Sequence, residues 1–374
     1  MKKPKIIIIG GGLAGLTAAI HLSGENYKVV LFEKDDYPKH KVCGEYISAE
    51  IIPYMKSLGI DLEDLNPKEI HQLLFSTQSG EKTTAKLPLG GLGISRFALD
   101  EFLYQKVIQN GVEVIPEQVS SAEFIDGSFQ VETQSGAKHS ADVVLGAFGK
   151  RSILDKELNR DFIQQKSSWL AVKAHYQNDS FPKDLVALHN FKGGYCGLSA
   201  TETGAINVCY LSTYQSFKAH KNSDDFKENV LRKNPCLDQF FKESKRIFER
   251  DLSIAQISFQ PKPQIENNML MLGDAAGLIH PLCGNGMAMA IHSAKIASEA
   301  IINSLKGNDF NRKIMETQYQ KNWNLHFKNR NLMGRRLQRI LLNPNLAKAS
   351  QKLVHYFPAL LPKIIAKTHG QPIL

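Results

Sequence analysis

The first thirty-four residues restrict the possible folds more than any other stretch of the chain. An apolar run at residues 5–9 leads directly into a turn whose Gly10, Gly12 and Gly15 have the spacing GxGxxG. A helical pattern follows, and then a second apolar run that ends at Glu33. A buried strand, a glycine turn, a helix and a second strand make a βαβ unit, which predicts an α/β fold with a Rossmann-type domain.

Each glycine of this turn has a physical role at a dinucleotide. Gly10 permits the tight turn, Gly12 lets the backbone approach a pyrophosphate, and Gly15 allows the helix to pack closely on the strand. Free N–H groups and a partial positive charge at the helix start favour the same anionic group. Glu33 is suited to accept hydrogen bonds from the hydroxyls of an adenosine ribose. The residues assigned to the dinucleotide here are Gly10, Gly12, Leu13, Ala14, Gly15, Glu33 and Lys34.

A second stretch, GDAAGLIHPLCGNGMAMAIHSA at residues 273–294, follows an apolar strand pattern and selects between the dinucleotides. Asp274 is expected where open α/β sheets bind ligands, and a carboxylate there can hold ribityl hydroxyls, which FAD has and NAD lacks. The loop that follows would face the isoalloxazine, and the helix from about Asn285 would direct its N-terminal dipole at the ring. The alternative is a glycine-rich strand–helix loop without a ligand. We predict FAD, with contacts from Asp274, Pro281, Gly284, Asn285, Gly286 and Met287.

Five sequence blocks, spread over residues 6 to about 305, are similar to those of a known flavoprotein superfamily. They read GGGLAGLTAA, LFEKDDYPKHKVCGEYIS, ISRFALDEFL, DVVLGAFGKRS and GDAAGLIHPLCGNGM. The chain resembles the FAD-dependent superfamily that includes p-hydroxybenzoate hydroxylase, the geranylgeranyl reductases and the flavin-dependent halogenases.

The resemblance assigns further residues to the cofactor. It implies that Arg96 contacts the phosphate–ribityl region of FAD and that Val119 offers its backbone to the adenine. It also implies that a loop with Lys41, Cys43 and Gly44 borders the flavin. The alternatives are a solvated arginine at a helix start for Arg96 and a small buried thiol without chemistry for Cys43.

Departures from the family pattern bear on the reaction. The fourth block has Ala147-Phe148-Gly149 where many hydroxylases have an acidic residue before the glycine. This difference weakens the inference that the chain handles NADPH as those hydroxylases do. Residues 193–204 replace the YxWxFP stretch of geranylgeranyl reductases, and the WxWxIP signature of halogenases is absent. The sequence therefore argues against halogenation and weakens the case for prenyl saturation.

The order of the motifs predicts a discontinuous domain organisation. Strand-rich segments at 69–95 and 156–265 are expected to form an inserted antiparallel β-sheet substrate domain, which in the resembling superfamily covers the flavin. Residues 310–374 are expected to form a basic helical C-terminal segment. The FAD-binding domain is expected to consist of residues 1–68, 96–155 and 266–309.

The predicted protein is an FAD-dependent oxidoreductase whose cofactor supplies most of the chemistry. Our first hypothesis is a monooxygenase that hydroxylates a small apolar substrate, aromatic or polyketide-like, through a flavin C4a-hydroperoxide. The alternative is a geranylgeranyl-reductase-like enzyme that reduces a carbon–carbon double bond, which the block HKVCGEYIS favours. A non-enzymatic FAD-binding or electron-transfer protein is the third hypothesis. Because the sequence has no second GxGxxG unit, NADH or NADPH is expected only as a transient reductant.

Two residues are candidates for catalysis. Cys43 is a candidate proton donor in the reductase hypothesis, and His280, beside the flavin loop, has either a substrate contact or a structural role. The twelve histidines are scattered without a metal-type pair and the five cysteines form no CxxC, so no metal site is predicted. Dispersed cysteines also fit a reducing cytoplasm.

The positive charge of the chain, +9 overall, is concentrated at its C-terminal end. From Phe310 to Leu374, twelve Lys/Arg residues stand against one acidic residue, Glu316, a balance of +11 that leaves −2 for the rest. Nucleic-acid binding by the main body is therefore not expected. The C-terminal segment is interpreted either as solvated helices or as a docking face for an anionic membrane or an acidic carrier protein. No stretch has the roughly 18 apolar residues of a membrane span, so we expect a cytoplasmic protein with at most peripheral membrane contact.

Overall fold

The N-terminal apolar run forms the centre of a six-stranded sheet in the computed structural model, which describes all residues except 1–2, 280–283, 305–309, 358, 361–364 and 366–369. The run has no alternation of polar residues because both faces of a parallel sheet are covered, and Ile6, Ile7 and Ile8 are fully buried. The pairs within the order β18-β10-β1-β2-β6 are parallel, and the edge strand β17 is antiparallel to β18. The strands are β1 (Ile6–Ile9), β2 (Val29–Phe32), β6 (Glu113–Ile115), β10 (Val143–Gly146), β17 (Ile265–Glu266) and β18 (Met269–Met271).

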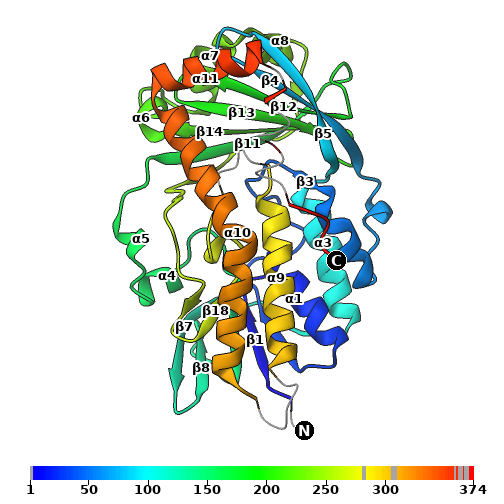
Figure 1. Ribbon diagram of the computed structural model, residues 1–374, viewed down its shortest axis with the longest axis vertical. Helices are drawn as coiled ribbons and strands as arrows, with labels where there is room; N and C mark the ends of the chain where they lie inside the picture. The colour runs from blue at the N-terminus through cyan, green and yellow to red at the C-terminus, as the bar shows by residue number, and fades with distance from the viewer. Residues whose placement is uncertain (1–2, 280–283, 305–309, 358, 361–364, 366–369) are drawn as a thin grey trace.

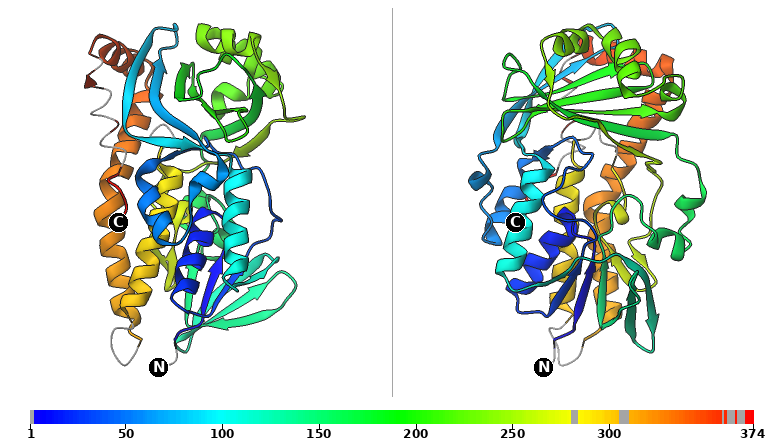
Figure 2. Two further views of the ribbon diagram at one scale, coloured as in Figure 1. Left: turned by 90° about the vertical axis from the view of Figure 1, so that its right-hand side faces the viewer. Right: turned by 180° about the vertical axis from the view of Figure 1, so that it is seen from behind.

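Long helices pack beside this sheet in successive contact. The helix α1 (Leu13–Gly24) packs against both α3 (Arg96–Gln109) and α9 (Gly286–Asn303), and α9 packs in turn against α10 (Arg312–Leu342). The side view shows α10 as the outermost helix of this group (Figure 2). The βαβ unit that the sequence predicts is confirmed, with the helix beginning directly after Gly12.

The inserted sheet contains nine strands, and it lies across the carboxyl end of the parallel sheet (Figure 1). The order is β15-β11-β14-β13-β12-β4-β5-β3, and β16 pairs with β11. The expectation of a wholly antiparallel sheet is wrong at one place, because β12 and β4 run parallel. These two strands come from segments far apart in the chain, so no hairpin imposes an antiparallel pairing. The strands are β3 (Tyr46–Ser48), β4 (Lys68–Ser76), β5 (Lys82–Gly93), β11 (Trp169–Gln177), β12 (Leu185–Phe191), β13 (Gly194–Ala200), β14 (Ile206–Thr213), β15 (Lys245–Arg246) and β16 (Leu252–Ala255).

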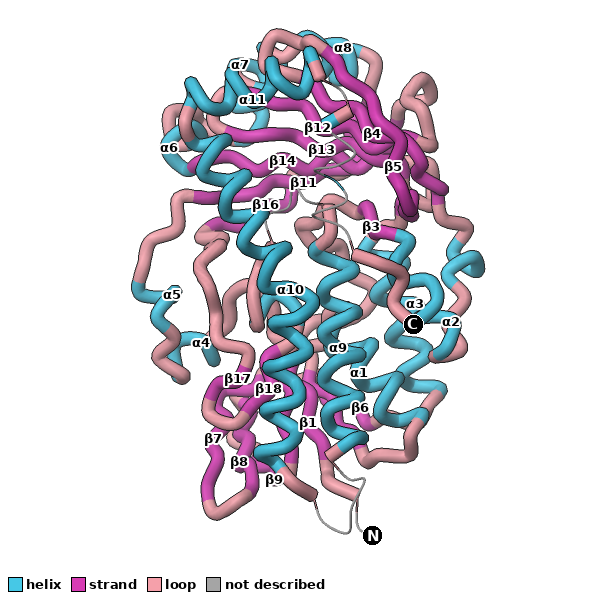
Figure 3. The backbone as a smooth tube through the Cα atoms, in the orientation of Figure 1, coloured by secondary structure: helices cyan, strands magenta, loops and turns pink. Residues whose placement is uncertain are grey.

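Most strands of the large sheet come from residues 68–93 and 169–255. An exception is β3, which lies within the segment 1–68 that was expected in the FAD-binding domain but pairs with β5 of the large sheet. A third sheet of β7 (Val119–Ile125), β8 (Ser128–Thr133) and β9 (Lys138–Ala141) lies at the opposite end of the molecule, and the sequence did not indicate it (Figure 3).

Short helices connect the strands. The α-helical ones are α2 (Ile52–Ser57), α4 (Leu154–Glu157), α5 (Asp161–Gln164), α6 (Tyr214–Phe217), α7 (Ser223–Asn229) and α8 (Pro235–Lys242). Single 3-10 turns are η1 (Ala49–Ile51), η2 (Leu62–Leu65), η3 (Leu231–Lys233) and η4 (Gly273–Ala275). One apolar core fills the space between the parallel sheet and its helices, and a second lies between the large sheet and α7–α8.

The C-terminal segment is helical, as the sequence predicts. Helix α10 runs the length of the molecule, from the N-terminal end of the parallel sheet to the large sheet, and is followed by α11 (Pro344–Tyr356) (Figure 1). The break falls at Pro344, where Asn343 caps the new helix by accepting hydrogen bonds from the N–H groups of Asn345 and Leu346. Two further prolines of this segment, Pro358 and Pro362, lie outside the described residues. Although α10 is long, no helix among the described residues combines the length and the apolarity that crossing a membrane requires.

Candidate functional site

A cavity of about 1290 Å³ lies between the carboxyl edge of the parallel sheet and the large sheet. Residues from all five sequence blocks line this cavity. Of the predicted site residues, Gly15 does not line it, and His280 and Pro281 lie outside the described residues. The predicted residues that line it are Gly10, Gly12, Leu13, Ala14, Glu33, Lys34, Lys41, Cys43, Gly44, Arg96, Val119, Asp274, Gly284, Asn285, Gly286 and Met287.

The glycines of the first turn differ in what surrounds them. Gly10 has φ +106°, and a Cβ atom there would stand 2.5 Å from the carbonyl oxygen of Ala147. At Gly15 a Cβ atom would stand 1.9 Å from the carbonyl oxygen of Gly10, which explains why this glycine serves packing and does not face the cavity. At Gly12 the nearest atom would be Nη2 of Arg96, 3.9 Å away. Gly12 therefore presents bare backbone to open space in the cavity.

The start of α1 offers a positive electrostatic environment to that space. The helix has no acidic residue in its first turn and no side chain that caps its N–H groups. The cavity can therefore receive an anionic group at the helix N-terminus, as the GxGxxG spacing predicts.

Arg96 is held above Gly12 by a bidentate ion pair. Its Nε and Nη2 lie 2.6 and 2.7 Å from the two carboxylate oxygens of Asp100, whose Oδ2 is also 3.0 Å from Nζ of Lys41. Burial by itself lowers the pKa of Arg96, but the Asp100 carboxylate outweighs this and raises it above the usual value. The side chain of Arg96 is only 14% exposed. The alternative of a solvated arginine is therefore wrong, and a fixed cation faces the site predicted for phosphate.

Glu33 closes the edge of the cavity beside the glycine turn. Its carboxylate accepts hydrogen bonds from the N–H groups of Gly11, at 2.7 Å, and of Asp35, at 3.0 Å. The hydroxyl of Tyr37 donates to the carbonyl oxygen of Gly11. These bonds fix the orientation of the carboxylate, whose predicted contact with ribose hydroxyls stays a prediction.

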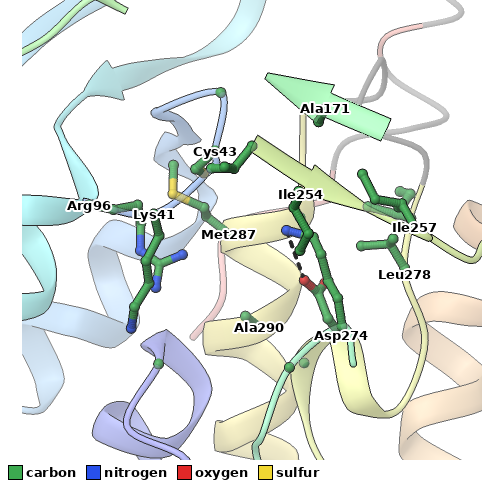
Figure 4. Close-up of a pocket in the computed structure, with 18 of the residues that line it drawn as sticks. Lys41, Cys43, Arg96, Ala171, Ile254, Ile257, Asp274, Leu278, Met287 and Ala290 are labelled. Atoms are coloured by element: carbon green, nitrogen blue, oxygen red, sulfur yellow. Dashed lines mark ion pairs between the residues drawn. The ribbon is translucent and has the colours of Figure 1, made fainter. Parts of the chain in front are cut away.

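Asp274 lies in η4, directly after β18, with its carboxylate in the cavity (Figure 4). Nζ of Lys150 is 3.5 Å from Oδ2 of Asp274. Lys262 donates from Nζ to the backbone carbonyl oxygens of Asp274, at 2.8 Å, and Lys150, at 3.2 Å. Burial lowers the pKa of Lys262 to about 8. The sequence predictions missed both lysines, although Lys150 stands within the fourth block.

The helix α9 begins at Gly286, one residue after the position expected from the sequence, with Asn285 as its N-cap. Asn285, Gly286 and Met287 all line the cavity, and the first turn contains no acidic residue. A second helix N-terminus thus faces the same cavity, where its dipole would stabilise negative charge on a bound ring.

The loop with Lys41, Cys43 and Gly44 is held against the large sheet through its backbone. Three side chains from three neighbouring strands each donate one hydrogen bond to a carbonyl oxygen of this loop. The bonds are Lys173 Nζ to Lys41 at 3.2 Å, Asn207 Nδ2 to Cys43 at 3.2 Å, and Ser199 Oγ to Gly44 at 3.1 Å.

Glu45 ends this loop with a buried carboxylate and a left-handed φ of +52°. Oε1 forms an ion pair with Lys173 and accepts from the backbone N–H of Arg96 at 2.7 Å, while Oε2 lies 2.7 Å from Nε2 of His175. Burial by itself raises the pKa of Glu45, but the His175 hydrogen bond and the Lys173 charge more than offset it and hold the pKa below its usual value. Glu45 therefore joins the cavity loop, α3 and β11.

Two histidines that are far apart in the sequence meet at Glu45. Single ligand atoms of His40, Glu45 and His175 lie within 4.8 Å of one another, and Nδ1 of His40 is buried without a hydrogen-bond partner. A His–Glu–His set can hold zinc. However, the ammonium group of Lys173 already neutralises Glu45 and would repel a divalent cation. We therefore assign the cluster a positioning role and no metal.

The second part of the cavity is apolar. The large sheet and the loops beside it contribute side chains such as Ala171, Ile254, Ile257 and Leu278 (Figure 4). The C-terminal segment contributes another wall, which the sequence did not predict. Its cavity-lining apolar residues are Leu337, Ile340, Leu353, Val354, Leu360 and Ile365.

The model of the FAD binding domain family matches residues 3–315. The chain belongs to this family. Its cofactor is FAD, and the two helix N-termini, the uncovered backbone of Gly12 and the fixed cation of Arg96 fit the anionic and ring portions of that group. Membership in the FAD binding domain family also makes the protein a flavin-dependent oxidoreductase, as the sequence predicts.

Solved structures similar to this member of the family include halogenases and a reductase-like protein. A flavin-dependent brominase, Bmp2, superposes with a TM-score of 0.78 at 18% identity and covers 98% of this chain and 94% of its own. A geranylgeranyl bacteriochlorophyll reductase-like protein from Thermoplasma acidophilum has a TM-score of 0.71 at 19% identity, covering 99% and 93%. At these identities the structures establish the shared fold.

Relatives by sequence show the same two groups. The chain is 24% identical to the 1H-pyrrole-2-carbonyl-[peptidyl-carrier protein] chlorinase of Pseudomonas fluorescens, over 85% of this chain and 80% of that protein. It is 22% identical to the digeranylgeranylglycerophospholipid reductase of Methanococcus vannielii, over 85% and 81%.

Proposed function

We propose that this protein is a monooxygenase that hydroxylates an apolar aromatic or polyketide-like molecule, with NADH or NADPH as a transient reductant. The observation that carries the proposal is the continuity of the cavity. Its polar part, around Gly12 and Asp274, and its apolar part belong to one cavity, and apolar walls suit a hydrophobic ring or chain.

The residues of the chain would divide the work along this cavity. Arg96 and the start of α1 bind the phosphates, and Asp274 holds the ribityl portion. The start of α9 faces the ring, and the apolar walls exclude water and orient the substrate. When bound and reduced, FAD would supply the electrons that activate molecular oxygen for hydroxylation.

The position of Cys43 favours a second candidate function, the reduction of a carbon–carbon double bond. It lines the cavity beside Met287 (Figure 4), and Asn207 fixes its backbone. A thiol at this position could donate the proton that completes such a reduction.

Oxygen-isotope labelling tests these alternatives. The FAD-loaded protein is supplied with NADH or NADPH, a panel of alkylphenols and prenylated lipids, and oxygen-18 gas, and the products are analysed by mass spectrometry. Hydroxylation predicts a product that carries one labelled oxygen atom. A product that gains two hydrogen atoms and no label, and whose formation is lost in Cys43→Ala, would replace this proposal with the reductase. No turnover of any compound in the panel, with rapid reoxidation of the flavin, would overturn the proposed substrate class.

A further inference from the structure

One face of α11 carries large apolar side chains that the protein leaves exposed. Leu346, Leu353, Tyr356 and Phe357 are between 50% and 71% exposed. The spacings of seven and ten residues put Leu346, Leu353 and Tyr356 on the same side of the helix, and Phe357 follows them as its C-cap. We call these four residues the α11 face. It lies at the end of the molecule that contains the large sheet, away from the N-terminus (Figures 1 and 2).

The sequence segment that carries the α11 face is basic. The sequence contains ten Lys/Arg and no Asp or Glu from Thr317 to the C-terminus. Lys348 and Lys352 on α11 are exposed, as are Arg336 and Arg339 near the end of α10. Because no acidic side chain neutralises this segment from within, it favours an anionic partner.

The α11 face is also continuous with the cavity. Leu353 is half exposed and at the same time lines the cavity, together with its neighbour Val354. Leu360, just beyond the helix, lines it as well. An apolar molecule that contacts the α11 face therefore lies next to the wall of the apolar chamber.

We propose that the α11 face and its basic surroundings dock the protein on an anionic lipid bilayer, from which an apolar substrate passes α11 into the cavity. The inference rests on the proposed function only in assuming an apolar substrate. An amphipathic helix with lysines on its polar face binds at the lipid headgroup boundary, where the apolar side chains are buried and the cations meet lipid phosphates. An acidic carrier protein would satisfy the charges, but the large apolar side chains beside the cavity wall favour a lipid phase.

Co-sedimentation with vesicles tests the docking step. The full-length, FAD-loaded protein is expected to sediment with phosphatidylcholine vesicles that contain phosphatidylglycerol at low salt and much less with phosphatidylcholine alone. Leu346→Asp/Phe357→Asp should abolish binding, and Lys348→Glu/Lys352→Glu should weaken it about tenfold or more. The matched controls are Ile125→Asp, an exposed apolar residue at the far end of the molecule, and Lys28→Glu/Lys138→Glu, which changes the charge equally.

The docking proposal is overturned if the wild type does not bind anionic vesicles at low salt, or if the control variants lose as much binding as the α11 variants. Binding to an acidic acyl carrier protein in the absence of vesicle binding would also overturn it. Flavin absorbance and melting temperature confirm that each variant is folded.

A comparison of two substrate preparations tests the delivery step. A substrate embedded in anionic vesicles should be turned over several-fold more slowly by Leu346→Asp/Phe357→Asp than by the wild type, while the same substrate in detergent should be turned over equally. Equal turnover rates of the variant and the wild type in both preparations would overturn delivery from the bilayer. Loss of oxygen-18 incorporation in detergent would instead contradict the proposed function, so the two failures are distinguishable.

Discussion

Glu45 and Lys173 form an ion pair whose two side chains are both completely buried. The pair connects the end of the cavity loop with the middle of β11, and Lys173 also holds the carbonyl oxygen of Lys41. Two charges in the interior are costly to desolvate and are retained only with further hydrogen bonds. Here His175 and the backbone N–H of Arg96 supply them. The pair thus fixes the cavity loop and the start of α3, which carries the Arg96 cation.

Removal of the cation from this pair should be strongly destabilising. Lys173→Met leaves the Glu45 carboxylate buried beside an apolar chain, so we expect the free energy of unfolding to fall by about 3–5 kcal/mol. Denaturant unfolding of the FAD-free protein measures it. The double variant Lys173→Met/Glu45→Gln should recover part of the loss, because no uncompensated charge remains.

A positioning role of the same pair has a separate readout. If the pair sets the cavity loop against the flavin, the double variant should still weaken FAD binding and shift the visible flavin absorption bands relative to the wild type. Flavin bands and FAD affinity identical to the wild type in a folded double variant would leave the pair with a structural role alone.

Gly12→Val should abolish FAD binding without disturbing the fold. Apart from its chain neighbours, no protein atom would lie closer than 3.9 Å to a Cβ atom there, so we expect the FAD-free protein to accommodate the side chain. The same side chain occupies the space in which the pyrophosphate must approach the backbone. Fluorescence titration with FAD measures the affinity, and the melting temperature of the FAD-free protein is the control. Wild-type affinity in this variant would show that the glycine turn does not hold the pyrophosphate.

Asp274→Ala should weaken FAD binding by roughly 1.5–3 kcal/mol, because a charged group loses its hydrogen bonds to the ribityl hydroxyls. This corresponds to an increase of the dissociation constant of roughly 10- to 150-fold. Lys150→Met, which removes the cation 3.5 Å from the carboxylate, is the matched variant and should have a smaller effect. Full retention of the yellow cofactor by Asp274→Ala after dialysis would contradict the role assigned to Asp274.

Because of His189, we expect the protein to lose stability as the pH falls into the mildly acidic range. It is buried in β12, and Nδ1 lies 2.8 Å from Oγ of Ser76. Burial, with a smaller contribution from the Lys82 charge, lowers the pKa of His189 to about 4, against an ordinary value of 6.5. The unfolded chain therefore binds more protons between these two pH values. The stabilisation is complete above pH 6.5 and is lost as the pH falls toward 4, on the order of 3 kcal/mol in total.

Denaturant unfolding at a series of pH values measures this loss. His189→Gln should flatten the decline of the unfolding free energy between pH 6.5 and 4. His71→Gln, which removes an exposed imidazole from β4, controls for the substitution itself. An unchanged decline in His189→Gln would show that other groups cause the acid sensitivity.

The parts of the fold that the sequence predicted are those determined by local chemistry. The apolar run at residues 5–9 could only be buried on both sides, and the glycine spacing after it allows few alternatives to a phosphate-binding turn. The position of Asp274 between a strand and a helix was likewise predicted from the local sequence pattern. Every predicted site residue within the described residues except Gly15 lines one cavity, and Gly15 has the packing contact that its place in the motif requires.

The tertiary structure alone decided which distant residues meet. Lys173, His175, Ser199 and Asn207 stand in ordinary strand patterns, and nothing near them in the sequence indicates that they hold the cavity loop. Strand register places them on neighbouring strands, and their side chains then meet loop residues more than a hundred positions away in the chain. The C-terminal segment shows the same division. The sequence indicated that it is helical and basic, because both properties are local. Only its packing against the large sheet showed that it also forms a wall of the cavity.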